Sequence, residues 1–122
     1  MIGYVTLGTN DLPRAAGFYD KLLGSIGARR GWESDRGIGW ATSRTSPSLA
    51  VMKPFDGKPA TVGNGVMVGL SVDSKEKVDA VHKLALELGG TDEGPAGPRG
   101  PGFYGGYFRD LDGNKLVVFF MG

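Results

Sequence analysis

The spacing of hydrophobic residues predicts a strand followed by a helix at the start of the chain. Residues 4–9 alternate in character and are rich in β-branched side chains, which is typical of a strand. Apolar residues between 12 and 26 then recur at helical spacing. The pair Asn10-Asp11 provides a helix N-cap, and the glycines that follow residue 23 end the helix.

Three short strands complete this first module. They are predicted at residues 28–33, 38–43 and 49–53, because turn-forming residues separate them. The segment 54–57, Pro-Phe-Asp-Gly, is a turn. The first module therefore reads as βαβββ and covers about residues 1–60.

The same order then restarts. Residues 66–72 predict a strand, Ser74 is a good N-cap, and an apolar stripe follows at helical spacing: Val78, Val81, Ala85 and Leu88. Strands are predicted at 104–110 and 115–121. Between the helix and these strands, residues 94–102 are so rich in Gly and Pro that we expect a long loop, able to act as a lid.

The second half therefore repeats the first. A shift of 63 residues places Leu7 on Leu70 and Gly27 on Gly90. The shared strand–helix–strands order supports the repeat more strongly than the few matched letters do. We expect one domain, residues 1–122, made of two pseudo-symmetric modules with a boundary near residue 60.

Composition limits the classes of function. The chain has 122 residues, with 14 Lys and Arg against 13 Asp and Glu. This balance does not favour a nucleic-acid partner. The chain contains no Cys, so disulfides and thiolate chemistry are excluded. No signal peptide or apolar run of membrane-spanning length is visible, and we expect a cytoplasmic protein with no membrane partner.

Four motifs carry a resemblance to a known family. They are YVTLGTNDL at 4–12, AAGFYD at 15–20, KPFDG at 53–57 and FRDLDGNKL at 108–116. With these motifs the chain resembles the vicinal oxygen chelate superfamily, which includes glyoxalases, bleomycin-resistance proteins and extradiol dioxygenases. The resemblance implies an α+β fold in which two βαβββ modules form a cup-shaped mixed sheet.

The resemblance also implies a divalent metal held by His, Gln and Glu on the first and last strands of each module. Those ligand positions fall on Tyr4, Met67 and Val117, and residues 49–53 offer no ligand either. His82, the single His, lies on the second predicted helix and has no evident partner. Because first-row metals prefer imidazole and carboxylate ligands at such sites, we expect no metal and no cofactor.

Without a metal, aromatic and polar side chains on the strands are the candidates for ligand binding. Flat apolar rings with polar tips suit a small-molecule cleft. The candidate residues are Tyr4, Thr6, Trp40, Met67, Tyr104 and Tyr107. Trp40 and Tyr107 have core packing as an alternative. Arg109 could also line the cleft, and its alternative is an ion pair within the hairpin with Asp110 and Asp112.

Three functions remain open at this point. The first is a metal-free protein that binds an unidentified small molecule. The second is a lyase or dioxygenase, similar to lactoylglutathione lyase, with a non-standard site and no assigned catalytic residue. The third is a structural dimer without a ligand. The family habit of pairing modules predicts a homodimer in each case.

Overall fold

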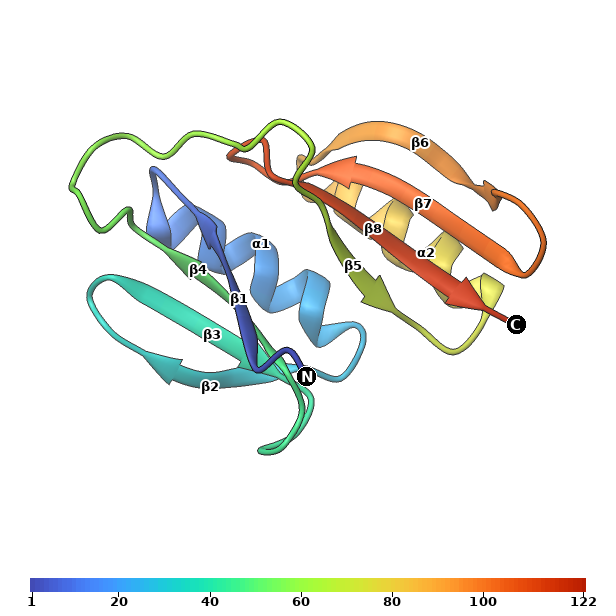
Figure 1. Ribbon diagram of the computed structural model, residues 1–122, viewed down its shortest axis with the longest axis horizontal. Coiled ribbons are helices and arrows are strands. Elements are labelled where there is room, and N and C mark those ends of the chain that lie inside the picture. The colour runs from blue at the N-terminus through green and yellow to red at the C-terminus, as the bar shows by residue number, and fades with distance from the viewer. The chain divides into compact units, whose positions relative to one another are not determined.

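The structure, a computed structural model, describes residues 1–122 and divides into two compact units, Met1–Val62 and Gly63–Gly122. Each unit contains one helix and a four-stranded mixed sheet in the order strand, helix, strand, strand, strand (Figure 1). The predicted α+β fold of two βαβββ modules is confirmed. Neither helix is long and apolar enough to cross a membrane.

Unit 1 pairs its first and last strands. Its elements are β1 (Tyr4–Gly8), α1 (Leu12–Gly24), β2 (Arg29–Glu33), β3 (Gly37–Ala41) and β4 (Ser48–Met52). The sheet order is β1-β4-β3-β2, with β1 parallel to β4 and the other pairs antiparallel. The helix packs on one face of this sheet (Figure 1).

The residues at its ends define α1 as the sequence predicts. The Asp11 carboxylate accepts a hydrogen bond from the Arg14 N–H at 3.1 Å, which satisfies one of the free donors of the first turn. After the helix, Gly27 has φ 88°, a conformation that favours glycine. The apolar face of α1 and the sheet bury a core that includes Leu22, Trp40 and Val51.

Unit 2 has the same topology. Its elements are β5 (Val68–Ser71), α2 (Lys75–Glu87), β6 (Thr91–Pro98), β7 (Phe103–Arg109) and β8 (Lys115–Met121). The sheet order is β5-β8-β7-β6, again with the first and last strands parallel. Ser74 caps α2 as predicted, by accepting a hydrogen bond from the Lys77 N–H at 3.1 Å.

The hairpin between β7 and β8 is built on one buried carboxylate. Asp110 is 5% exposed and accepts hydrogen bonds from the Asp112 N–H, the Asn114 N–H and the Asn114 side-chain amide, each at 2.9 Å. Gly113 turns the chain with φ 89°. These contacts explain the Asp-Leu-Asp-Gly-Asn motif as a structural turn.

The prediction of a loop at residues 94–102 is wrong. Most of that segment belongs to β6, which pairs antiparallel with β7 through two register irregularities. Proline lacks the N–H that a central strand needs, but β6 lies at the edge of its sheet, where one side requires no partner. The composition that argued for a lid therefore marks an irregular edge strand.

Candidate functional site

The sheet of unit 1 has one face against α1 and one free of it. Successive side chains on a strand alternate between faces. Leu7 and Trp40 are buried on the α1 side, whereas Tyr4 is 68% exposed and Thr6 is also exposed. We call the second surface open face 1.

One row of residues crosses open face 1 from edge to edge. The register places Thr6 beside Ala50, Ala50 beside Gly39, and Gly39 beside Trp32. The two central positions are small and buried, so the row has a low floor between a hydroxyl at one edge and an indole at the other. Sequence reasoning placed Thr6 here but did not single out Trp32.

A pocket of about 420 Å³ opens at the Thr6 edge of this face. Its outer wall is the segment after β4, which Asn10 holds in place. The Asn10 side chain donates a hydrogen bond to the Ala60 carbonyl at 3.2 Å and accepts one from the Ala60 N–H at 2.6 Å. The Arg36 guanidinium lies 5.4 Å from the centre of the Phe55 ring at the rim.

Unit 2 has a corresponding open face 2, on which Tyr107 lies. Tyr107 pairs with Val117, and Val117 with Gly69. The Tyr107 ring has two cations near it, since the Arg99 guanidinium is 5.6 Å and the Lys115 ammonium 5.7 Å from its centre. Cations over an aromatic ring are attracted to its electron-rich face.

Met67 directly precedes β5 and is 45% exposed. It stands two residues before Gly69, the β5 position on open face 2. The expectation that Tyr4 and Met67 share one interior joins the two units and stays a prediction.

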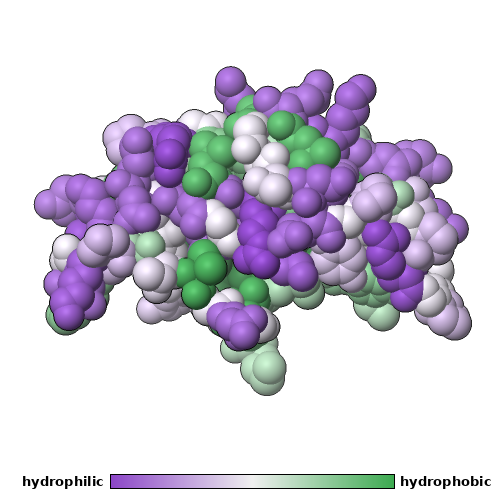
Figure 2. Space-filling view, turned by 90° about the horizontal axis from the view of Figure 1, so that it is seen from above, coloured by the Kyte–Doolittle hydropathy of each residue, from purple (hydrophilic) through white to green (hydrophobic).

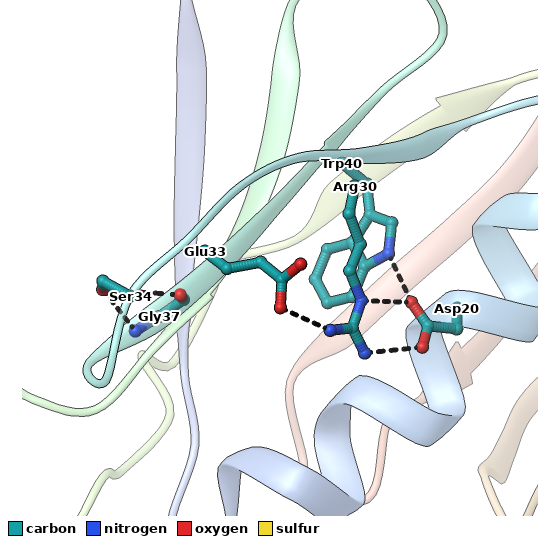
Figure 3. Close-up of polar contacts among 6 residues, drawn as sticks. All are labelled: Asp20, Arg30, Glu33, Ser34, Gly37 and Trp40. Atoms are coloured by element: carbon teal, nitrogen blue, oxygen red, sulfur yellow. Dashed lines mark hydrogen bonds and ion pairs between the residues drawn. The ribbon is translucent and has the colours of Figure 1, made fainter.

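Trp40 lies on the helix side of unit 1, in the core. It is 2% exposed, and its indole N–H donates a hydrogen bond to the Asp20 carboxylate at 2.9 Å (Figure 3). The Arg30 guanidinium binds the same carboxylate at 2.9 and 2.7 Å and also contacts Glu33 (Figure 3). The hydrogen bonds from Arg30, with a smaller effect from Trp40, lower the pKa of Asp20 against the opposing effect of burial.

Tyr104 also lies on the helix side, in unit 2. Its hydroxyl donates a hydrogen bond to the Asp79 carboxylate on α2 at 2.7 Å. That hydrogen bond is the main cause of a raised Tyr104 pKa, because the bond holds the neutral phenol and Asp79 opposes a phenolate. Tyr104 borders a small pocket of about 80 Å³ whose lining includes no Asp, Glu or His side chain.

Two further polar residues have partners that the sequence did not reveal. Arg109 contacts Glu93 on β6, so the ion pair expected with Asp110 and Asp112 is wrong in its partner. His82 is buried, with its Nε2 within 3.2 Å of the Asp92 carboxylate and 3.1 Å of the Tyr107 carbonyl.

The family of the chain follows from a match that covers most of its length. Residues 1–118 match the model of the Glyoxalase/Bleomycin resistance protein/Dioxygenase superfamily. The chain belongs to this superfamily. A glyoxalase/bleomycin resistance protein from Albidiferax ferrireducens T118 is 36% identical to it, with a TM-score of 0.92 over 100% of this chain and 99% of that one.

More distant members of the superfamily share the fold. A glyoxalase/bleomycin resistance protein/dioxygenase family enzyme from Burkholderia phytofirmans PsJN is 18% identical, with a TM-score of 0.79 and coverage of 98% of both chains. A lactoylglutathione lyase from Agrobacterium tumefaciens is 21% identical, with a TM-score of 0.73, over 98% of this chain and 92% of that one. No protein of curated function matches the chain.

The residues present do not fit the divalent metal that the superfamily resemblance implies. The strand register shows that Ala50 on β4 corresponds to Val117 on β8. Thr6 pairs with Ala50 in unit 1, and Gly69 pairs with Val117 in unit 2. Ala50 and Val117 are both apolar and buried. Within each unit, no group of three or more His, Asp or Glu side chains lies close enough together to hold a metal ion.

Proposed function

We propose that this superfamily member binds a small organic molecule on its open sheet faces and does so without a divalent metal. The observation that carries the proposal is the donor chemistry of those faces. Ala50 and Val117 occupy the register positions where a carboxylate ligand would be needed, and Tyr4 and Met67 replace the imidazoles that the resemblance implies.

The pocket at the Thr6 edge supports a ligand of modest size. Its volume of about 420 Å³ lies within the range of small-molecule sites, which run from about 300 to 1,000 Å³. Its lining combines the Thr6 hydroxyl, the Met52 side chain and the cation of Arg36. Such a mixture orients a ligand through a few polar groups and covers the rest with apolar surface.

Two measurements on the purified protein test the proposal. Elemental analysis should find no stoichiometric Ni, Zn, Fe or Mn, and divalent metals should leave the melting temperature unchanged. A thermal-shift screen over metabolites and aromatic antibiotics should give ligands that raise it. About one tightly bound metal per chain would overturn the metal-free part, and a screen without any stabilising compound would overturn the binding part.

Variants on the two sides of the sheets locate the binding. We expect Tyr4→Ala to weaken each ligand found about tenfold, because Tyr4 is exposed on open face 1. The matched control is Tyr104→Ala, which removes a tyrosine from the helix side and should leave the affinity unchanged. Equal effects of the two substitutions would contradict binding on the open face.

We also propose a homodimer. Large apolar side chains are exposed in both units, among them Ile2 at 57%, Val66 at 58% and Met121 at 67%. On the face drawn in Figure 2, apolar surface (green) occurs in patches among hydrophilic side chains (purple). A stable interface buries on the order of 1,000 Å² or more. Light scattering at micromolar concentration should report a dimer, and a monomer alone would contradict the proposal. The cytoplasmic location stays a prediction from the sequence.

A further inference from the structure

A second pocket of unit 1, of about 450 Å³, lies toward the β2 edge of the sheet, away from the β1 edge that carries Thr6. Its lining comes from β2, from the end of β3 and from the loop that leads into β4. The lining residues that could contact a ligand are Arg29, Trp32, Ala41, Arg44 and Ser48. The Trp32 edge of the row across open face 1 belongs to this pocket.

A β-bulge turns Trp32 onto the open face. The register of β2 against β3 shifts between Arg30, which pairs with Trp40, and Trp32, which pairs with Gly39. In a regular strand Arg30 and Trp32 would point to the same side, toward α1. The additional residue, Gly31, breaks the alternation, so Arg30 reaches Asp20 and Trp32 faces away from the helix.

Gly39 gives the Trp32 indole room to lie against the sheet. A Cβ at position 39 would be 2.2 Å from the indole Nε1 and 2.6 Å from Cε2, so any side chain there would force the indole to move. The indole therefore rests on the backbone of β3, and Trp32 as a whole is still 42% exposed. A partly exposed indole offers a flat surface on which an aromatic ring can stack.

The pocket is cationic because two of the three arginines that line it, Arg29 and Arg44, lack acidic partners. Residues 1–62 hold eight Lys and Arg but five Asp and Glu. Asp20 and Glu33 bind Arg30 on the helix side. Arg29 and Arg44 form no ion pair within 4.0 Å, and no carboxylate lines the pocket.

Arg44 stands on a loop that its own hydroxyl groups organise. The Ser46 hydroxyl accepts hydrogen bonds from the Thr42 hydroxyl at 3.2 Å and from the Ser43 N–H at 3.0 Å. The Ser43 hydroxyl in turn accepts one from the Ser46 N–H at 3.1 Å. A loop fixed in this way lowers the entropy cost of holding a cation at the rim of a pocket.

We infer that this pocket takes a planar aromatic molecule that carries a carboxylate, with the ring on Trp32 and the carboxylate between Arg29 and Arg44. Arginine binds carboxylates through paired N–H donors, and an indole stacks on flat rings. The inference rests on the proposed binding function of open face 1 and deepens it by naming the ligand class and the residues that select it.

The two indole N–H groups of the chain allow a direct test. The tryptophans are Trp32 and Trp40, so an isotope-labelled spectrum contains two indole signals, which Trp32→Phe assigns. We expect 2-naphthoate to shift the Trp32 signal in a saturable way and to leave the Trp40 signal unchanged. The neutral 2-naphthol and the cation 2-naphthylmethylamine should bind at least about tenfold more weakly. Naphthyl phosphate tests whether the site prefers a carboxylate to another acid. Cyclohexanecarboxylate tests whether the site needs a flat ring.

Variants separate this pocket from the rest of the face. The double substitution Arg29→Gln with Arg44→Gln should weaken 2-naphthoate about tenfold or more. The matched control, Lys21→Gln, removes a cation of α1 that lines neither pocket of unit 1 and should leave the affinity unchanged. The unchanged Trp40 signal shows that each variant is folded.

Three results would overturn the inference. They are the absence of saturable 2-naphthoate binding, equal binding of 2-naphthol, and an affinity that the double substitution does not change. If other compounds stabilise the protein without moving the Trp32 signal, this inference fails and the proposed function stands. If no small molecule binds anywhere, both fail. Tighter binding of naphthyl phosphate would correct the acid class and overturn the choice of carboxylate.

Discussion

Removal of the Asp20 carboxylate should destabilise unit 1 mainly because the uncharged indole of Trp40 loses its hydrogen-bond acceptor. The carboxylate accepts hydrogen bonds from Arg30 and from the indole N–H of Trp40, which is 2% exposed (Figure 3). In Asp20→Ala the buried indole N–H loses its acceptor. Trp40 extends from β3 onto α1, where its ring centre is 5.7 Å from that of Tyr19, so little of its side chain meets water.

The magnitude follows from the different exposure of the two contacts. A buried donor left without a partner costs about 1–3 kcal/mol. The Arg30 ion pair adds at most about 1 kcal/mol, since the side chains of Arg30 and Asp20 are 34% and 41% exposed and solvent screens them. We therefore expect Asp20→Ala to lower the free energy of unfolding by about 2 kcal/mol. Glu33→Ala, the control, removes a more exposed contact of the same arginine and should cost less than about 0.5 kcal/mol.

Urea unfolding at pH 7, followed by tryptophan fluorescence, measures both values. The pH dependence provides a second test. Arg30 lowers the pKa of Asp20 in the folded state below its ordinary value of 3.8, so its stabilising effect is complete above that value. The effect is lost as the pH falls through the folded-state pKa. The difference between the wild type and Asp20→Ala should therefore stay constant near neutral pH and shrink below pH 3.8. Equal costs of Asp20→Ala and Glu33→Ala would refute the reasoning.

Three further substitutions or titrations test other parts of the structure. Asn10→Ala removes both hydrogen bonds to Ala60 and should cost about 1 kcal/mol in urea unfolding, together with faster proteolysis of the segment after β4. Ultraviolet titration should find the phenol of Tyr104 ionising above pH 10.0, because Asp79 holds it neutral, and Tyr104→Phe should remove that step. Gly39→Ala should displace the indole that covers it, cost about 1–3 kcal/mol, and shift the tryptophan emission to the red.

Local patterns predicted most of the fold because they report on local physics. Asp11 and Ser74 cap helices by contacts within three residues, and the Asp110 carboxylate builds its hairpin on donors two and four positions away. The failure at residues 94–102 has the opposite origin. Proline excludes a central strand, but the sequence does not show whether a strand lies at the edge of its sheet.

The candidate site was harder to predict, because the face that a strand residue occupies depends on register. Trp40 was a candidate for ligand binding, and the structure buries it against α1. Trp32 was not a candidate, and it lies on the open face. The bulge at Gly31 places Trp32 on the face opposite to the one that simple alternation predicts. The signals of this bulge are the glycines at 31 and 39, which are recognisable only once β2 is paired with β3.

The net charge of +1 conceals an uneven distribution that bears on the chemistry of the open faces. Residues 63–122 hold six Lys and Arg and eight Asp and Glu, and several of those acids have structural partners: Asp79 binds Tyr104, Glu93 binds Arg109, and Asp110 builds a hairpin. In unit 1 the acids are fewer, and Arg29 and Arg44 have no acidic partner.

A metal-dependent member of the superfamily would attract the oxygens of its substrate with a divalent cation. Here the positions suited to such a cation hold Ala50 and Val117, and positive charge is supplied by guanidinium groups at the edge of the sheet. That arrangement selects a ligand by the position of its acid group relative to a flat ring, which the comparison of 2-naphthoate with 2-naphthol measures.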